Sequence, residues 1–459
     1  MNKKIIQIFL LLFCSNSFLN AQEQDSLTEY NFTLQEAVEY GLENAYRSII
    51  AQKEIEKTLK QKWEIISEGL PQISGEANYT YNLVQPVTLI PAELSGGAPG
   101  TFVPVTFGTE QNMAANATWN QLLFDGSYIV GIQSAKTLLQ ISENQKVKTD
   151  LEVKKAITDA YGNVLLARQS TTIARKNVET IEQNLSETRI IYENGLSELE
   201  DVEQLEITLL NQRSNLNNSI RMLEIAYDML KLSMGIPIED KIYASDNLEK
   251  VSEDNFPLLV ISENYNIENN IDYRIAEDQT NLAEVEVKLE KSKALPTLTA
   301  FVNYGVQGYS DAFTFFNDNQ TYFDQSILGV NLSVPIFSSG KRSARTAQKE
   351  IALEQAQLEK EQTRNEVKME IERARNEYIY AIEDHQNKEQ ALELAERIEN
   401  KNEIKFFEGL ATSFELSEAR QQLFQSQQQY LQSMLDLLTA KTDLETLLDT
   451  TRYEEIQNN

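Results

Sequence analysis

The chain has 459 residues, of which 24% are charged, and its formal net charge at pH 7 is −29. An acidic surface of this kind repels nucleic acid, so a nucleic-acid-binding function is excluded. The single cysteine, Cys14, lies in a predicted signal peptide, which excludes disulfides and thiol chemistry from the mature chain. One histidine, His385, cannot form a histidine-rich metal site, and we expect no metal and no cofactor.

The N-terminal segment predicts a signal peptide over residues 1–21, cut after Ala21. A basic start is followed by an apolar run over residues 5–13, far below the roughly 18 apolar residues that a membrane-spanning helix needs. An N-terminal membrane anchor is the alternative. Lipid attachment at Cys14 is a second alternative, which the bulky Phe13 disfavours.

Two long tracts, residues 105–236 and 336–459, contain no proline and have the composition of long helices. Large residues recur every seven positions in each tract, and mostly small or polar residues stand three positions after them. The large residues are Val202, Leu209, Leu216, Leu223 and Leu230 in the first tract and Leu416, Leu423, Tyr430, Leu437 and Leu444 in the second. These heptads predict closely packed helices in a left-handed coil, and an ordinary two-stranded coiled coil has the same periodicity.

The sequence is duplicated within the chain. Leu70-Pro71 and Asn78-Tyr79 recur, 225 positions later, as Leu295-Pro296 and Asn303-Tyr304. Gly126 and Gly195 are 69 residues apart, and so are Gly340 and Gly409. Each half therefore predicts the order helix, strand, loop, strand, very long helix, turn and helix.

The predicted boundaries follow from this duplication. The first repeat, 22–240, is expected to hold strands 73–84 and 112–123, a long helix 127–194 and a helix 198–234, with a first helix over 34–69 and a long loop over 85–111. The second repeat, 271–449, is expected to hold a helix, strands 297–308 and 326–336, a long helix 340–408 and a helix 412–448. Residues 241–270 form an equatorial linker, and 450–459 form a C-terminal tail.

Each Leu-Pro pair ends a helical pattern and starts a strict alternation of residue types. One face of the predicted strands carries Ala77, Tyr79, Trp119 and Tyr304, and the other carries Glu76, Asn78, Asn116 and Asn303. Strands of about ten residues with one apolar face are typical of transmembrane barrels, and a soluble sheet with one buried face is the alternative. Four strands cannot close a barrel, and open edges are not tolerated in lipid, so copies of the chain must associate.

The ordered and duplicated motifs together resemble the TolC-type outer-membrane efflux proteins over essentially all of the mature chain. The motifs are the Leu-Pro starts of the strands, Phe-Asp-Gly-Ser at 124–127 and Pro-Ile-Phe-Ser-Ser-Gly at 335–340 after them, and the Gly-Leu tips at 195–196 and 409–410. The resemblance implies an α+β membrane protein, in which a trimer forms one transmembrane β-barrel from four strands per chain. A long α-helical coiled-coil barrel continues from it into the periplasm of a Gram-negative bacterium. Gln121-Leu122 departs from this pattern, since the family commonly has proline there.

The resemblance also implies a function. The homotrimer would be the passive outer-membrane exit duct of a tripartite efflux or type I secretion system, contacting lipid, a periplasmic adaptor protein and an inner-membrane pump. A non-transporting coiled-coil surface or structural protein is the alternative, although such a protein needs no polar-lined barrel. The sequence contains no nucleophile, metal or phosphate-binding constellation, which argues against an enzyme. The substrate stays open among drugs, metal ions and secreted protein.

Three sets of site residues follow from the resemblance. The tips, Gly195, Leu196, Ser197, Gly409, Leu410 and Ala411, are expected to contact the adaptor, with a simple turn as the alternative. Glu415 and Glu418 lie three residues apart on one helix face and, with Asp201 and Gln204 in the first repeat, are expected to form the periplasmic aperture. A solvated acidic face is the alternative there. The barrel lumen is expected to be lined by Glu76, Asn78, Asn116 and Asn303.

Overall fold

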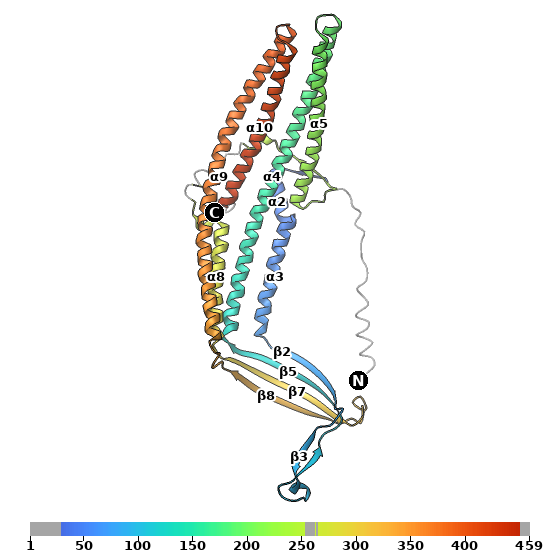
Figure 1. Ribbon diagram of the computed structural model, residues 1–459, viewed down its shortest axis with the longest axis vertical. Helices are drawn as coiled ribbons and strands as arrows, with labels where there is room; N and C mark the ends of the chain where they lie inside the picture. Colours follow the sequence, from blue (N-terminus) through green and yellow to red (C-terminus); the bar gives the residue numbers. More distant parts are fainter. Residues whose placement is uncertain (1–28, 253–261, 263–264, 450–459) are drawn as a thin grey trace.

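A computed structural model of the chain describes residues 29–252, 262 and 265–449. The predicted signal peptide, the C-terminal tail and part of the equatorial linker lie outside the described residues. The molecule is strongly elongated, with two helical hairpins at one end and a curved sheet at the other (Figure 1).

Two very long helices run the length of the helical part. They are α4, Gly126–Glu193, and α9, Lys341–Phe407. At 1.5 Å per residue, the 68 residues of α4 extend about 100 Å. Two further helices, α5 (Leu199–Met234) and α10 (Ser413–Leu448), return along their upper halves, and α3 (Tyr46–Glu68) and α8 (Ile271–Ser292) pack along their lower halves (Figure 1). The ends of α4, α5, α9 and α10 lie within one residue of the boundaries expected from the sequence.

The first predicted helix, 34–69, is wrong as a single element. It consists of α2, Leu34–Asn44, and α3, with Ala45 between them in an extended conformation at φ −61° and ψ 135°. Gly235 lies so close that a Cβ atom built on it would be 2.3 Å from the Asn44 carbonyl oxygen. The helix therefore breaks where another part of the chain packs against it, and no local sequence signal marks the position.

Four antiparallel strands form the sheet in the order β2-β5-β7-β8. They are β2, Gln72–Tyr81; β5, Gln111–Asp125; β7, Thr297–Ser310; and β8, Tyr322–Ser333. All four predicted strands need a corrected boundary. Strand 73–84 ends at Tyr81, strand 112–123 extends to Asp125, and strand 297–308 extends to Ser310. Strand 326–336 is shifted toward the N-terminus, and β8 ends before Pro335, which cannot donate to a ladder. Within one chain, β2 and β8 are edge strands.

The predicted long loop and the predicted equatorial linker both contain further helices and strands. The loop over 85–111 holds a hairpin of β3, Val87–Pro91, and β4, Phe102–Thr106, joined by the short 3-10 helix η1, Ala92–Ser95. The linker over 241–270 holds β6, Lys241–Ala244; α6, Leu248–Ser252; and η2, Ile267–Asn269. Strand β6 pairs in parallel with β1, Glu29–Phe32, so the start of the described chain is fixed to the middle of the sequence.

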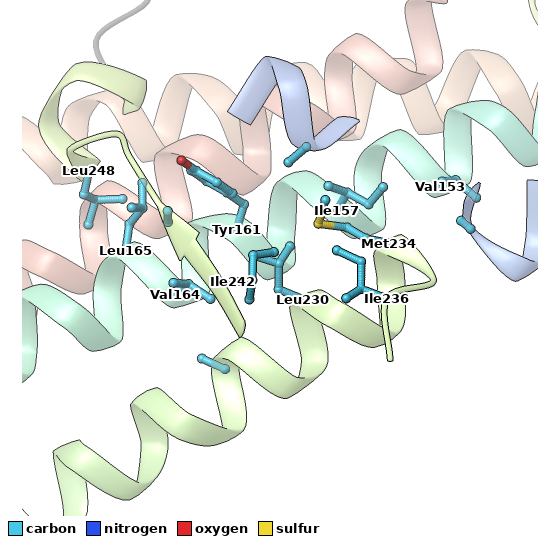
Figure 2. Close-up of a cluster of buried hydrophobic side chains, with 14 of the residues drawn as sticks. Val153, Ile157, Tyr161, Val164, Leu165, Leu230, Met234, Ile236, Ile242 and Leu248 are labelled. Atoms are coloured by element: carbon cyan, nitrogen blue, oxygen red, sulfur yellow. The ribbon is translucent and has the colours of Figure 1, made fainter. Parts of the chain in front are cut away.

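The largest buried cluster lies at this equator, between α4, α5, β6 and α6 (Figure 2). Ile157, Tyr161 and Leu165 of α4 pack there with Leu230 and Met234 of α5. The Tyr161 hydroxyl donates to the Phe32 carbonyl oxygen at 2.9 Å, which links this core to β1. The equatorial segments β6 and α6 therefore pack around the midpoint of α4, and Met434 of α10 brings the second repeat into the same cluster.

Candidate functional site

The sheet has one polar face, and all four predicted lumen residues lie on it. Glu76 pairs with Asn116 across β2 and β5, and Asn303 lies opposite Thr118 across β5 and β7. The Asn303 side-chain amide donates to the Thr118 hydroxyl at 2.7 Å, and the Asn78 amide donates to Glu76 at 3.0 Å. Side chains on one face of a sheet alternate with those on the other, so this register separates the four residues from the aromatic set.

The opposite face of the sheet is apolar across all four strands. Ile73 pairs with Trp119, Trp119 with Val302, and Val302 with Leu328, which makes one apolar row perpendicular to the strands. Ala77 and Tyr304 lie on the same face. The row is exposed at both edge strands, so a large apolar surface faces outward from the isolated chain.

Both helical hairpins reverse at their tips in the same way. Gly195 and Gly409 adopt left-handed conformations, with φ of 75° and 72°. The next amides, Leu196 and Leu410, donate to the carbonyl oxygens of Ile191 and Lys405, which completes a Schellman motif at each end. The two leucines are 80% and 72% exposed, so each tip presents an apolar side chain.

The two returning helices also begin in the same way. Asp201 and Glu415 each form the N3 member of a capping box, at the starts of α5 and α10. The Thr412 amide and hydroxyl donate to the Glu415 carboxylate at 2.8 and 3.1 Å, and these hydrogen bonds lower the pKa of Glu415. Two of the acidic residues at the tips, Asp201 and Glu415, therefore stabilise the N-termini of α5 and α10.

Asp201 also connects the two tips. Partial burial would raise its pKa, but hydrogen bonds from Ser197, Ser413 and the Glu198 backbone lower the pKa of Asp201 below its ordinary value. Ser413 belongs to α10, so the first turns of α5 and α10 lie side by side. Gln204 lines a polar cleft of about 790 Å³ between these helices, whereas Glu418 is exposed.

A buried charge network was not anticipated from the sequence. Arg420 of α10 is 2% exposed and donates from Nε to Glu399 at 3.2 Å and from Nη2 to Glu403 at 2.9 Å, both on α9. The Asn184 amide of α4 donates to Glu403 at 3.1 Å. The network therefore joins the hairpin of the first repeat to that of the second. In the sequence, Glu399 and Glu403 are four apart on one helix face, but this spacing does not identify Arg420 or Asn184 as their partners.

The architecture defines a class of protein. The chain is duplicated, each repeat has a helical hairpin whose longer helix exceeds 60 residues, and the helices end in an amphipathic open sheet. This is the fold of outer-membrane channel subunits with a helical tunnel. Within the described part of the chain, none of the helices combines the length and the apolar character that a membrane crossing needs.

Comparisons with known proteins agree. Residues 266–450 match the family described as outer membrane efflux protein. The outer membrane protein TolC of Vibrio cholerae is 24% identical over 257 residues, which cover 52% of this chain and 54% of that protein. Among solved structures, CusC superposes with a TM-score of 0.69 at 16% identity, covering 94% of this chain and 95% of that one. The Campylobacter jejuni CmeC outer membrane channel also gives 0.69, at 15% identity and with coverages of 92% and 88%.

The chain is similar to the TolC-like outer membrane efflux proteins, and these similarities support a location in the outer membrane of a Gram-negative bacterium. By sequence it spans about half the length of the curated relatives that it matches. The matched family is described as an efflux protein, OpmQ of Pseudomonas aeruginosa is named as a pyoverdine export protein, and CmeC is named as a channel, so these similar proteins are transport proteins.

Proposed function

We propose that three copies of this chain form the passive outer-membrane exit duct of a tripartite efflux or type I secretion system. The observation that carries the proposal is the sheet: it has one apolar and one polar face, and both of its edges are unpaired in a single chain. In lipid, each unpaired backbone group costs several kcal/mol, so the edges must pair with those of other copies. Closing the ring puts the polar face inside and the apolar face against lipid.

Single-channel recording in planar bilayers tests this function, combined with light scattering of the purified protein in detergent. We expect an assembly of three chains and discrete, stable conductance steps. A monomeric protein without conductance would contradict the proposal and favour a coiled-coil structural protein.

The faces of the sheet allow a sharper test. Ala77 and Asn78 are neighbours on β2 but lie on opposite faces. Arginine at Ala77 would face hydrocarbon and is expected to cost about 2–4 kcal/mol at mid-depth, whereas arginine at Asn78 would face water. We therefore expect Ala77→Arg to lower the yield of assembled protein in the outer membrane much more than Asn78→Arg. Equal yields would refute this orientation.

We further propose that the two tips contact a periplasmic adaptor, which couples the duct to an inner-membrane pump. Support comes from the matching Schellman turns and from the exposed leucines that they present. Leu196→Asp combined with Leu410→Asp should abolish efflux while the mass of the assembly stays unchanged. Efflux at the normal rate in this variant would mean that the adaptor binds elsewhere.

The acidic residues at the starts of the returning helices are proposed to select cations. Asp201 and Glu415 have lowered pKa values, so both stay charged well below neutral pH, and rotational symmetry would repeat them and Glu418 around the axis. Glu415→Gln with Glu418→Gln is the suitable variant, because glutamine at Glu415 preserves the capping box. We expect weaker cation preference and weaker block by a trivalent cation. Unchanged selectivity would place the constriction at other residues.

A further inference from the structure

The hairpin of β3 and β4 extends from the end of the sheet that lies farthest from the helical tips (Figure 1). We define the distal arm as residues 83–109. Glu93 is the single charged side chain among these residues, in a chain that is 24% charged. Its carboxylate accepts a hydrogen bond from the Gly100 amide at 2.9 Å, so even this charge is used within the arm.

One face of the distal arm is apolar and has no cover in a single chain. Val87, Leu89 and Phe102 share this face by their register and are 59%, 62% and 63% exposed. Thr88 lies on the other face, which includes the half-buried Val103 and Val105. The second repeat has no equivalent hairpin between β7 and β8, so the arm is specific to the first repeat.

Two physical constraints limit what can cover this face. An isolated two-stranded hairpin is only marginally stable in water, so the ordered arm needs packing from outside itself. Lipid cannot provide it, because both edges of β3 and β4 would leave unpaired backbone groups in hydrocarbon. Prolines at 86, 91 and 104 also obstruct pairing of another strand to these edges, which leaves packing by the apolar face.

The root of the arm lies where copies of the chain would meet. The Asn82 amide donates to the Glu110 carbonyl oxygen at 2.7 Å, so the arm directly continues the pair formed by β2 and β5. Strand β2 is an edge of the sheet, and in a closed ring it would lie beside the next copy. Rotational symmetry then gathers the arms of all copies around one axis.

We propose that the distal arms of neighbouring copies pack together through the face of Val87, Leu89 and Phe102, forming an apolar collar at the extracellular mouth of the duct. The occupant of each exposed face is thus the same face of the other copies of this chain, which meet around the rotation axis. This inference rests on the proposed function, since it requires a closed ring of copies.

Cysteine cross-linking of the full chain in outer-membrane vesicles tests the collar. Cys14 is the only natural cysteine and lies in the predicted signal peptide, so an introduced cysteine is the only thiol expected in the mature chain. Leu89→Cys should shift from the monomer to the dimer band on a denaturing, non-reducing gel after mild oxidation. Thr88→Cys is the matched control: it lies one residue away on the opposite face and should stay in the monomer band.

Each outcome has one meaning. A Leu89→Cys protein that has trimer mass by light scattering but stays in the monomer band overturns the collar and leaves the proposed function intact. Equal dimer formation by Leu89→Cys and Thr88→Cys also overturns it, because the contact would then not depend on the face. Quenching of a fluorophore on Leu89→Cys by spin-labelled lipid would show that the arm lies in the membrane instead. A monomeric preparation would contradict the proposed function itself.

Discussion

At the scale of single residues, Arg420 provides the clearest energetic prediction. Removing one partner of a buried ion pair costs about 3–5 kcal/mol, because the remaining charges lose their compensation. Glu399 and Glu403 are partly exposed, so we expect Arg420→Ala to lower the free energy of unfolding by about 3 kcal/mol. The measurement is denaturant unfolding followed by circular dichroism.

A surface ion pair provides the control for this variant. Arg213 and Glu182 also join two helices, α5 and α4, but both side chains are about half exposed. Exposed pairs contribute at most about 1 kcal/mol, so Arg213→Ala should be nearly neutral. Similar losses in the two variants would show that the Arg420 network is not a special link between the hairpins.

Asp278 of α8 leads to a prediction about pH. The side chain is 6% exposed, and burial raises the pKa of Asp278 even though the Asn144 amide donates to its carboxylate and Arg274 lies nearby. The folded-state pKa is above the unfolded value, so the charged form is disfavoured in the folded protein. The contribution of Asp278 to the free energy of unfolding is therefore greatest at low pH, where its carboxyl group is protonated, and declines as pH rises through the raised pKa.

We expect Asp278→Asn to remove this decline and to raise the thermal midpoint at neutral pH. Asp272→Asn on the same helix is the control, because Asp272 pairs with Lys148 at a partly exposed position and its loss should have a small and opposite effect. A lower midpoint for Asp278→Asn would mean that the carboxylate is a stabilising partner in its ionised form.

At the scale of helices and strands, the sequence predicts those element ends that are determined by residues next to them in the chain. At the tips, Gly195 and Gly409 have positive φ and capping boxes start α5 and α10, so the reversals of both hairpins follow from residue types alone. Contacts between distant residues are different. Asn144 and Asp278 are 134 positions apart, and the break between α2 and α3 depends on Gly235, so neither could be inferred without the fold. The same holds for the Arg420 network.

Gly235 and Gly195 separate two physical reasons for a glycine at the end of a helix. Both have positive φ, 77° and 75°, and alanine in this conformation costs roughly 1–2 kcal/mol at either position. At Gly195 a Cβ atom would meet nothing within 4 Å, whereas at Gly235 it would be 2.3 Å from the backbone oxygen of Asn44. We expect Gly235→Ala to lower the thermal midpoint clearly more than Gly195→Ala. Equal shifts would mean that only backbone strain matters.

At the scale of the whole molecule, the sheet is incomplete in one chain, and this property could be predicted from the sequence. The alternation of Asn78, Tyr79, Asn116 and Trp119 predicts two faces, and the register places these residues accordingly. The distal arm could not be predicted in this way, because its prolines and glycines have the composition of a loop. Strands β3 and β4 form by antiparallel pairing with each other, across the segment that contains η1.

Closure of the sheet into a barrel should protect the backbone amides of its edge strands from hydrogen exchange. In one chain, β2 and β8 each leave one row of backbone groups unpaired, so roughly half of their amides should exchange fast. In a closed ring these amides bond to the neighbouring copy and exchange only when the ladder opens. We expect β2 and β8 of the purified assembly to be as protected as the central strands β5 and β7. The distal arm is an internal control, because its edges stay free even when its face is packed, and it should keep fast-exchanging amides. Fast exchange of alternate amides in β2 and β8, in a preparation with trimer mass, would show that the copies associate through their helices while the sheets stay open.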